Sequence, residues 1–180
     1  MQKKFRGKMQ NKFSISGYLK LADLITIFSL LSGFAAIVLF SRGKFSEGMI
    51  ALLFAAFFDW ADGQAARLLG KGTAFGKALD ISDLLSFGAA PAVFISAILP
   101  NYFGYATAGI FLTASLLRLA RFQIEETKFS IGMPTTLNGI IFPAIYFLQK
   151  YFIFDNFIFV FVALASSAFM LSSFEIKKII

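Results

Sequence analysis

Four aspartates and one arginine lie close together in an otherwise strongly apolar part of the sequence. The segment reads DWADGQAAR from Asp59 to Arg67, then continues through Gly76 to Asp80 and Asp83. An ionised carboxylate inside a lipid bilayer costs several kcal/mol, so such residues need partners and mark function. Four carboxylates cannot neutralise one another. We therefore expect them to bind cations.

The spacing of the carboxylates indicates phosphoryl-type chemistry. On a helix, Asp59 and Asp62 share a face, and the next apolar segment returns antiparallel with Asp80 and Asp83 at its beginning. Carboxylates bind divalent metal ions, and two such ions can clamp the oxygens of a phosphorus undergoing displacement. An arginine at the rim, Arg67, can pair with a phosphate. The pattern predicts phosphoryl transfer on a pyrophosphate substrate.

Small residues between the charges fit the same interpretation. Gly63, Ala66 and Gly76 would let a ligand lie close against the helices. Taken alone, Gly63 and Ala66 would more often be helix-packing residues and Arg67 a membrane-interface anchor. For the carboxylates together, the competing hypothesis is an ion pathway.

Composition predicts an integral membrane protein with a single domain over residues 1–180. Hydrophobic residues make up 58% of the chain, charged residues 15%, and the mean hydropathy is +0.75. The chain has no cysteine and no histidine, which excludes thiolate nucleophiles and histidine bases. Any metal must therefore have oxygen ligands, which favours Mg²⁺, Mn²⁺ or Ca²⁺. The net charge of +7 suits an anionic membrane surface or anionic substrate; no nucleic-acid partner is expected.

The apolar runs predict an all-α membrane protein with six transmembrane helices. Residues 1–20 form a basic leader in which 8–20 could be an interfacial helix. The six segments are Leu21–Phe40, Gly48–Leu69, Ala74–Leu99, Tyr105–Phe122, Leu137–Phe152 and Phe157–Phe174.

Basic residues predict the orientation of these segments in a cell membrane. With a cytoplasmic N-terminus, 14 Lys and Arg residues fall inside and three fall outside, namely Arg42, Lys44 and Lys150. Such an excess is typical of cytoplasmic loops. Both termini and the acidic cluster should therefore face the cytoplasm in a multi-pass arrangement.

These residues resemble the signature of the CDP-alcohol phosphotransferases, D-x2-D-G-x2-A-R-x8-G-x3-D-x3-D. The positions that match in identity and spacing are Asp59, Asp62, Gly63, Ala66, Arg67, Gly76 and Asp80. The resemblance implies six transmembrane helices, two divalent cations and a homodimer. It implies that Asp59, Asp62, Asp80 and Asp83 bind the metals and that Asp83 is also the catalytic base. The CDP-lipid would lie against Asp62, Gly63, Ala66, Arg67 and Gly76.

One spacing departs from the signature. Two residues separate Asp80 from Asp83 where the family has three, although Leu84–Gly88 realigns with the family. On an ideal helix, one missing residue turns Asp83 by about 100° and moves it by about 1.5 Å. A tight 3₁₀ turn could restore its direction.

Within that family the chain is most similar to the membrane-spanning phosphatidylserine synthases. The resemblance implies transfer of the phosphatidyl group of CDP-diacylglycerol, or of a CDP-archaeol-type ether lipid, to L-serine with release of CMP. Arg118 and Arg121 would hold the serine carboxylate, and Thr135 or Thr136 would offer a hydroxyl. The alternative for the two arginines is anchoring at the membrane surface.

Two other functions stay open at this point. A sister enzyme would use glycerol 3-phosphate or inositol phosphate as the acceptor, which calls for a denser basic cluster. A carrier or an inactive relative would release no CMP.

Overall fold

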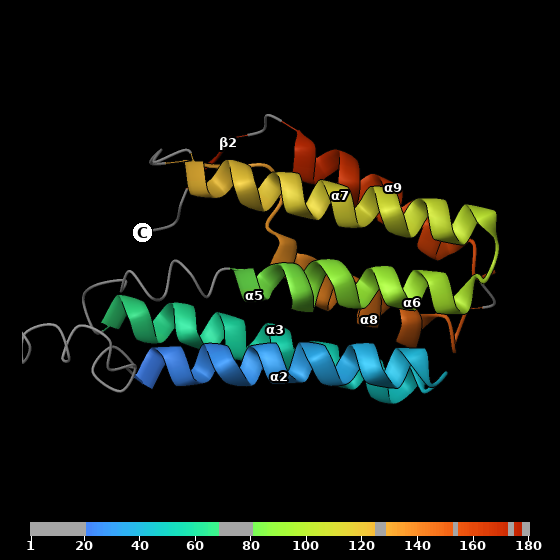
Figure 1. The fold of residues 1–180 in the computed structure, drawn as a ribbon, viewed down its shortest axis with the longest axis horizontal. Coiled ribbons are helices and arrows are strands. Elements are labelled where there is room, and N and C mark those ends of the chain that lie inside the picture. Colours follow the sequence, from blue (N-terminus) through green and yellow to red (C-terminus); the bar gives the residue numbers. More distant parts are fainter. Residues whose placement is uncertain (1–20, 69–80, 125–128, 153–154, 173–174, 178–180) are drawn as a thin grey trace, which may run out of the picture.

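The computed structural model describes residues 21–68, 81–124, 129–152, 155–172 and 175–177, and nearly all of them are helical. The long helices lie side by side along one direction (Figure 1). The helices are α2 (Leu21–Ser41), α3 (Phe45–Leu68), α5 (Ile81–Asp83), α6 (Ala90–Ile98), α7 (Tyr102–Ile124), α8 (Asn138–Leu148) and α9 (Ile158–Leu171). Each predicted apolar segment therefore contains helix, although α8 ends at Leu148, four residues before the predicted end at Phe152.

The described part of the third predicted segment is one continuous helical rod with irregular winding. It begins at Ile81, and a π-helical turn, η2 (Leu84–Ala89), separates α5 from α6. The N–H of Ala90 donates to the carbonyl of Leu85, which is the wider hydrogen-bond spacing of a π-helix. Pro91 follows and has no N–H with which to continue the ladder. No constant 3.6-residue period holds along this rod.

Helices are not the only described elements. Strands β1 (Phe129–Ile131) and β2 (Glu175–Lys177) pair antiparallel, with Ser130 opposite Ile176. The sequence analysis predicted no strand here, because three residues are too few to show an alternating pattern. A short 3₁₀ turn, η3 (Thr135–Leu137), then leads into α8.

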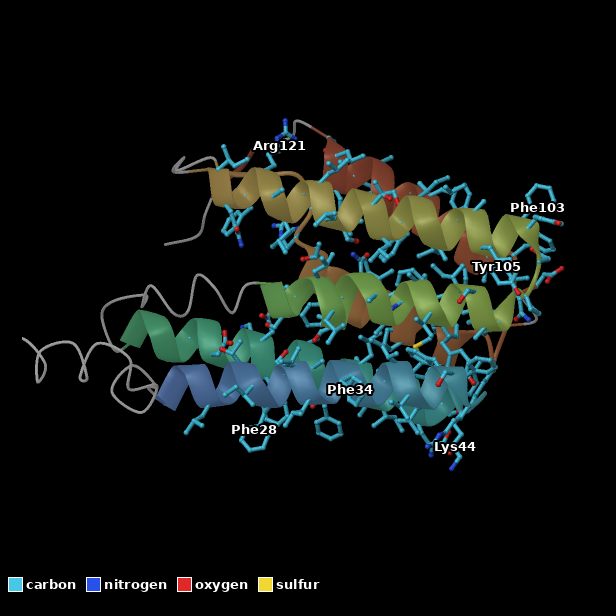
Figure 2. The ribbon with its side chains drawn as sticks, in the orientation of Figure 1. Phe28, Phe34, Lys44, Phe103, Tyr105 and Arg121 are labelled. Carbon is cyan, nitrogen blue, oxygen red and sulfur yellow. The ribbon has the colours of Figure 1, made fainter. Side chains whose placement is uncertain are left out.

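Helix α2 buries one stripe and exposes the opposite face. The buried positions recur every three or four residues at Ser29, Gly33, Ala36 and Phe40. The exposed positions are Leu24, Phe28, Leu31 and Phe34. Figure 2 shows Phe28 and Phe34 on the outer side of α2, where the ring of Phe28 lies 5.8 Å, centroid to centroid, from that of Phe58 on α3. The stripe fixes how α2 faces α3 and η2, because Ser29 donates to the carbonyl of Ala55 at 2.9 Å.

Aromatic rings form the core at one end of the bundle. Phe94 on α6 is fully buried, and its ring centroid lies 4.8 Å from that of Phe159 and 5.2 Å from that of Phe40. Further rings within 6.3 Å of Phe94 are those of Phe45, Phe142 and Tyr146. Phe94 lies 11 residues after Asp83, about 16 Å along a helix. The tightly packed aromatic end is therefore separate from the acidic end.

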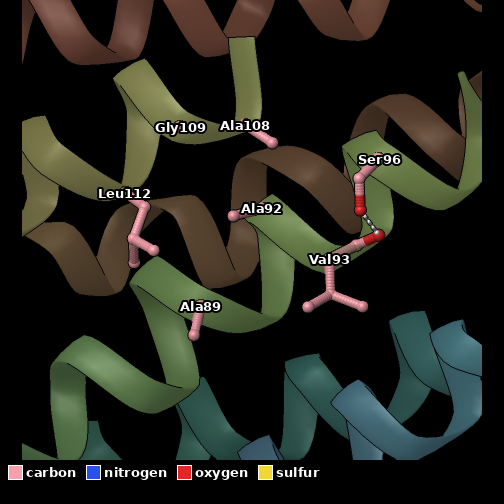
Figure 3. A pocket seen from close by; sticks show the side chains of 7 residues that line it. All are labelled: Ala89, Ala92, Val93, Ser96, Ala108, Gly109 and Leu112. Atoms are coloured by element: carbon pink, nitrogen blue, oxygen red, sulfur yellow. Dashed lines mark hydrogen bonds between the residues drawn. The ribbon is translucent and has the colours of Figure 1, made fainter. Parts of the chain in front are cut away.

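A shallow apolar pocket of about 220 Å³ lies between α6 and α7. Small side chains line it, among them Ala92, Ala108 and Gly109, together with Val93 and Leu112 (Figure 3). The Ser96 hydroxyl at its edge donates to the carbonyl of Val93 in its own helix. The pocket offers no side-chain group for chemistry.

Two described helices are long and apolar enough to cross a membrane by length and composition, over Leu24–Ser41 and Tyr102–Ile124. Three shorter apolar helices span Leu84–Ile98, Thr135–Leu148 and Ile158–Leu171. Large apolar side chains also lie on the outside of the bundle: Phe103 and Phe161 are each 71% exposed. An apolar outer surface of this kind needs an apolar environment or partner.

We predict that Gly33→Ala destabilises the fold. A Cβ at Gly33 would lie 2.7 Å from the backbone Cα of Ser86 on η2, so the two helices would have to separate. We expect a loss of about 1–3 kcal/mol and a melting temperature lower by several degrees. Gly109→Ala is the control, because a Cβ there meets no atom within 4 Å. Thermal unfolding of both variants in detergent checks this. Equal melting temperatures would contradict the packing described.

Candidate active site

The C-terminal half of α3 carries the first two aspartates of the signature. Asp59 and Asp62 are three residues apart and partly buried. A Cβ added at the neighbouring Gly63 would meet no atom of the described residues within 4 Å, so these residues leave the space beside this glycine open. Gly63, which directly follows Asp62, thus leaves room beside α3 among the described residues.

Asp62 is held by the neighbouring helix. The hydroxyl of Thr26 on α2 donates a hydrogen bond to an Oδ atom of Asp62. This bond orients the carboxylate, because α2 is already fixed against α3 by its buried stripe. The sequence analysis did not identify Thr26 as a partner of Asp62. The sequence feature that could have identified it is the position of Thr26, which lies on the same helical stripe as Ser29 and Gly33.

Asp59 lies where three other elements converge. Its carboxyl interacts with the side chain of Thr136 on η3, with that of Asp83 at the end of α5, and with the positive charge of Arg118 on α7. Residues that are 77 positions apart in the chain, Asp59 and Thr136, are therefore neighbours. The shortened spacing before Asp83 does not prevent this side chain from reaching Asp59. The winding at 81–83 is α-helical and is followed by the π turn, not by a tight 3₁₀ turn.

Arg118 points into the bundle. It is only 7% exposed, and its Nη1 donates to the hydroxyl of Thr135 at 3.4 Å. The guanidinium also lies 5.3 Å from the ring centroid of Phe122. A buried guanidinium near the carboxyl group of Asp59 fits an anion-binding role better than anchoring at a membrane surface, which calls for an exposed charge.

Arg121 lies elsewhere, although it is only one helical turn from Arg118. Its Nη1 is 3.5 Å from the carbonyl oxygens of both Leu171 and Ser172, at the C-terminal end of α9. A cation at that position is favourable because the last carbonyls of a helix carry partial negative charge. Figure 2 shows Arg121 at the outer edge of α7. The structure thus brings Arg118 and Thr135 together and places Arg121 against α9.

Several predicted site residues are described only in part or not at all. Ala66 and Arg67 belong to the last turn of α3. Gly76 and Asp80 lie outside the described residues. The described part of the chain contains no cluster of three acidic side chains that could hold a metal ion.

The described residues nevertheless fit a divalent cation. The carboxyl groups of Asp59 and Asp83 are close enough to interact directly. Two carboxylates at that separation repel each other unless a proton or a cation lies between them. The donor set consists of oxygens alone, which hard cations such as Mg²⁺, Mn²⁺ and Ca²⁺ prefer.

Comparison with known proteins points to one family. The family model described as CDP-alcohol phosphatidyltransferase matches residues 19–172. The chain is 30% identical over 178 residues to the archaetidylserine synthase of Methanothermobacter thermautotrophicus. This match covers 95% of this chain and 75% of the relative.

Two further relatives are both CDP-diacylglycerol–serine O-phosphatidyltransferases. The protein of Methanocaldococcus jannaschii is 35% identical over 130 residues, covering 72% of this chain. The protein of Saccharomyces cerevisiae is 34% identical over 169 residues, covering 82%. In each case the match spans 61% of the relative's own length. The region that the family model matches includes Thr26, Asp59, Asp62, Asp83 and Arg118. Because this match spans most of the sequence, the chain belongs to the CDP-alcohol phosphatidyltransferase family.

Proposed function

We propose that this chain is an enzyme that transfers the phosphatidyl-type group of a CDP-lipid to the hydroxyl of L-serine and releases CMP. The observation that carries this proposal is the buried contact between Arg118 and Thr135 beside the Asp59 carboxyl. It combines an acidic centre for a pyrophosphate with a guanidinium suited to the carboxylate of an amino acid. The names of the relatives favour the same acceptor.

The lipid substrate would approach from within a membrane. We place the six helical segments as membrane spans, with both termini and the acidic end on the cytoplasmic side. The apolar exposed faces of the described helices and the excess of basic residues on one side support this arrangement. The chain would act as a homodimer, as the family resemblance implies.

The carboxylates of Asp59, Asp62, Asp80 and Asp83 would hold two divalent cations. When bound, such cations neutralise charge that develops on the pyrophosphate and on the departing CMP. Thr26 orients Asp62 for this role. Gly63, Ala66, Arg67 and Gly76 would border the CDP group, and the open space at Gly63 is consistent with this.

Asp83 would act as the base. The serine oxygen forms a bond to the phosphorus that carries the lipid, the bond from that phosphorus to the bridging oxygen breaks, and CMP leaves with the bridging oxygen. Asp83 accepts the hydroxyl proton of serine. Its contact with Asp59 keeps it at the same centre, and Arg118 beside Thr135 would hold the serine carboxylate, with Arg121 as a more distant basic residue.

The direct test is CMP release by the purified full chain in detergent. CDP-diacylglycerol and a CDP-archaeol-type lipid are each supplied with L-serine, glycerol 3-phosphate or inositol phosphate, in Mg²⁺ or Mn²⁺. We expect CMP release with serine and not with the phosphorylated acceptors. Release only with a phosphorylated acceptor would assign a sister activity. Absence of CMP with every acceptor would favour a carrier or an inactive relative.

Removing one carboxylate or the metals should stop the reaction. We expect Asp59→Asn to lower CMP release by roughly a thousandfold or more, because charge developing on the phosphate is then poorly stabilised. Asp155→Asn is the control, since Asp155 is exposed in the connection between α8 and α9. EDTA should abolish activity, and added Mn²⁺ should restore it. Activity that survives both treatments would rule out the metal assignment.

Thr26 should act as a positioning residue for Asp62. We expect Thr26→Val to weaken Mn²⁺ binding by about tenfold to a hundredfold, because the hydrogen bond that orients the carboxylate is lost. Thr26→Ser should retain wild-type affinity. Thr113→Val is a control, because the Thr113 hydroxyl donates to the carbonyl of Gly109 in its own helix. Calorimetric titration of Mn²⁺ without substrate measures the effect. Equal affinities of Thr26→Val and wild type would refute this role.

A further inference from the structure

The side-chain oxygen of Asn138, the first residue of α8, accepts no hydrogen bond from any residue that the structure describes. Asn138 is fully buried, and its Nδ2 donates to the sulfur of Met170 at 3.6 Å. Its Oδ1 has no partner among the described residues. Buried polar atoms without a partner are rare in folded proteins. This oxygen therefore has capacity for an external donor.

Asn138 belongs to the same turn as the acceptor-side residues of the proposed site. Its backbone N–H donates to the carbonyl of Thr135, whose hydroxyl accepts from Arg118. The intervening Thr136 interacts with Asp59. On α7, Ser115 lies one turn before Arg118 and also reaches the Met170 sulfur, at 3.8 Å. Asn138 is thus bonded to η3 through its backbone and to Met170 of α9 through its side chain, within three residues of the threonines that reach Arg118 and Asp59.

The chemistry of serine leaves one group for this oxygen. In the proposed function, the hydroxyl of serine faces Asp83 and its carboxylate pairs with Arg118. The remaining group is the α-ammonium, which has three donors and no acceptor. A neutral amide oxygen can accept one of them, whereas it can offer nothing to a carboxylate or phosphate oxygen.

We infer that Oδ1 of Asn138 accepts a hydrogen bond from the ammonium group of the acceptor, and so selects an amino acid over a hydroxy acid. This inference rests on the proposed function. An acceptor without the amine would leave the buried oxygen without a partner in the complex, and sites built around such a bond discriminate strongly against the incomplete analogue.

The test compares L-serine with 3-hydroxypropanoate, which has the same hydroxyl and carboxylate but lacks the amine. CMP release by the full chain, at saturating CDP-lipid, gives kcat/KM for each acceptor. We expect wild type to prefer serine by roughly tenfold to a hundredfold, as one hydrogen bond to a charged group would produce. Asn138→Leu should reduce this preference to within about threefold. Because the preference is a ratio, it does not depend on the fraction of folded enzyme.

Two further variants separate recognition from packing. Asn138→Asp keeps an acceptor oxygen at the same position and should retain the preference for serine. Met170→Leu removes the sulfur that Nδ2 contacts and should leave the preference unchanged. An undiminished preference in Asn138→Leu would overturn the inference; if that variant does not fold, loss of the preference in Asn138→Asp would do so.

CMP release by the wild-type protein alone tests the proposed function, separately from the role of Asn138. Wild type that releases CMP with neither serine nor 3-hydroxypropanoate would remove the serine activity itself, and the role of Asn138 with it. Wild type that uses serine, with an amine preference that does not depend on Asn138, would remove only the role of Asn138.

Discussion

A carboxylate inside an apolar helix bundle must be stabilised by hydrogen-bond donors, by positive charge or by cations, because its apolar neighbours provide none of these. The described aspartates of this chain meet that constraint with groups from separate helices. Thr26 of α2 donates to Asp62, and Asp59 interacts with Thr136 of η3 and with the charge of Arg118 on α7. The site is therefore the place where these elements converge. Its residues cannot be assigned to one element.

One end of the bundle is packed with aromatic rings, and the other end carries the carboxylates. Around Phe94 the rings pack at distances typical of favourable aromatic pairs, and this end supplies rigid apolar packing. Toward the other end the buried stripe of α2 changes from Phe40 and Ala36 through Gly33 and Ser29 to Thr26. Small and polar residues bury less apolar surface, so this end contributes less apolar packing than the aromatic end. At this end the carboxyl groups of Asp59 and Asp83 lie close together, and the described residues leave the space beside Gly63 open.

The acceptor side shows how tertiary contacts separate residues that are neighbours on a helix. Arg118 and Arg121 are one turn apart, and the sequence predicts that they share a ligand. In the structure Arg118 is buried against Thr135, whereas Arg121 reaches the last carbonyls of α9. Both positions are favourable for a cation, one beside carboxylates and the other at a helix C-terminus. The sequence places both arginines near the C-terminal end of α7. The contacts with the neighbouring helices decide where each guanidinium lies.

Apolar patterning alone was enough to predict the helices and to bring Asp59 close to Asp83, because burial of apolar surface follows the helical period. Among the described residues, Asp62 does not join these two in one acidic cluster. Apolar patterning could not predict the direction of Asp83, since a π turn directly follows this residue and changes the rotation per residue on which any helical projection depends. Nor could it identify Thr26, whose hydroxyl donates a hydrogen bond to Asp62. The same holds for Asn138, whose buried side-chain oxygen has no hydrogen-bond partner among the described residues. The sequence thus determined which charged residues are present, their order along the chain and the helices on which they lie. Tertiary structure decided which side chains meet, because contacts across 36 or 77 residues depend on how the helices pack.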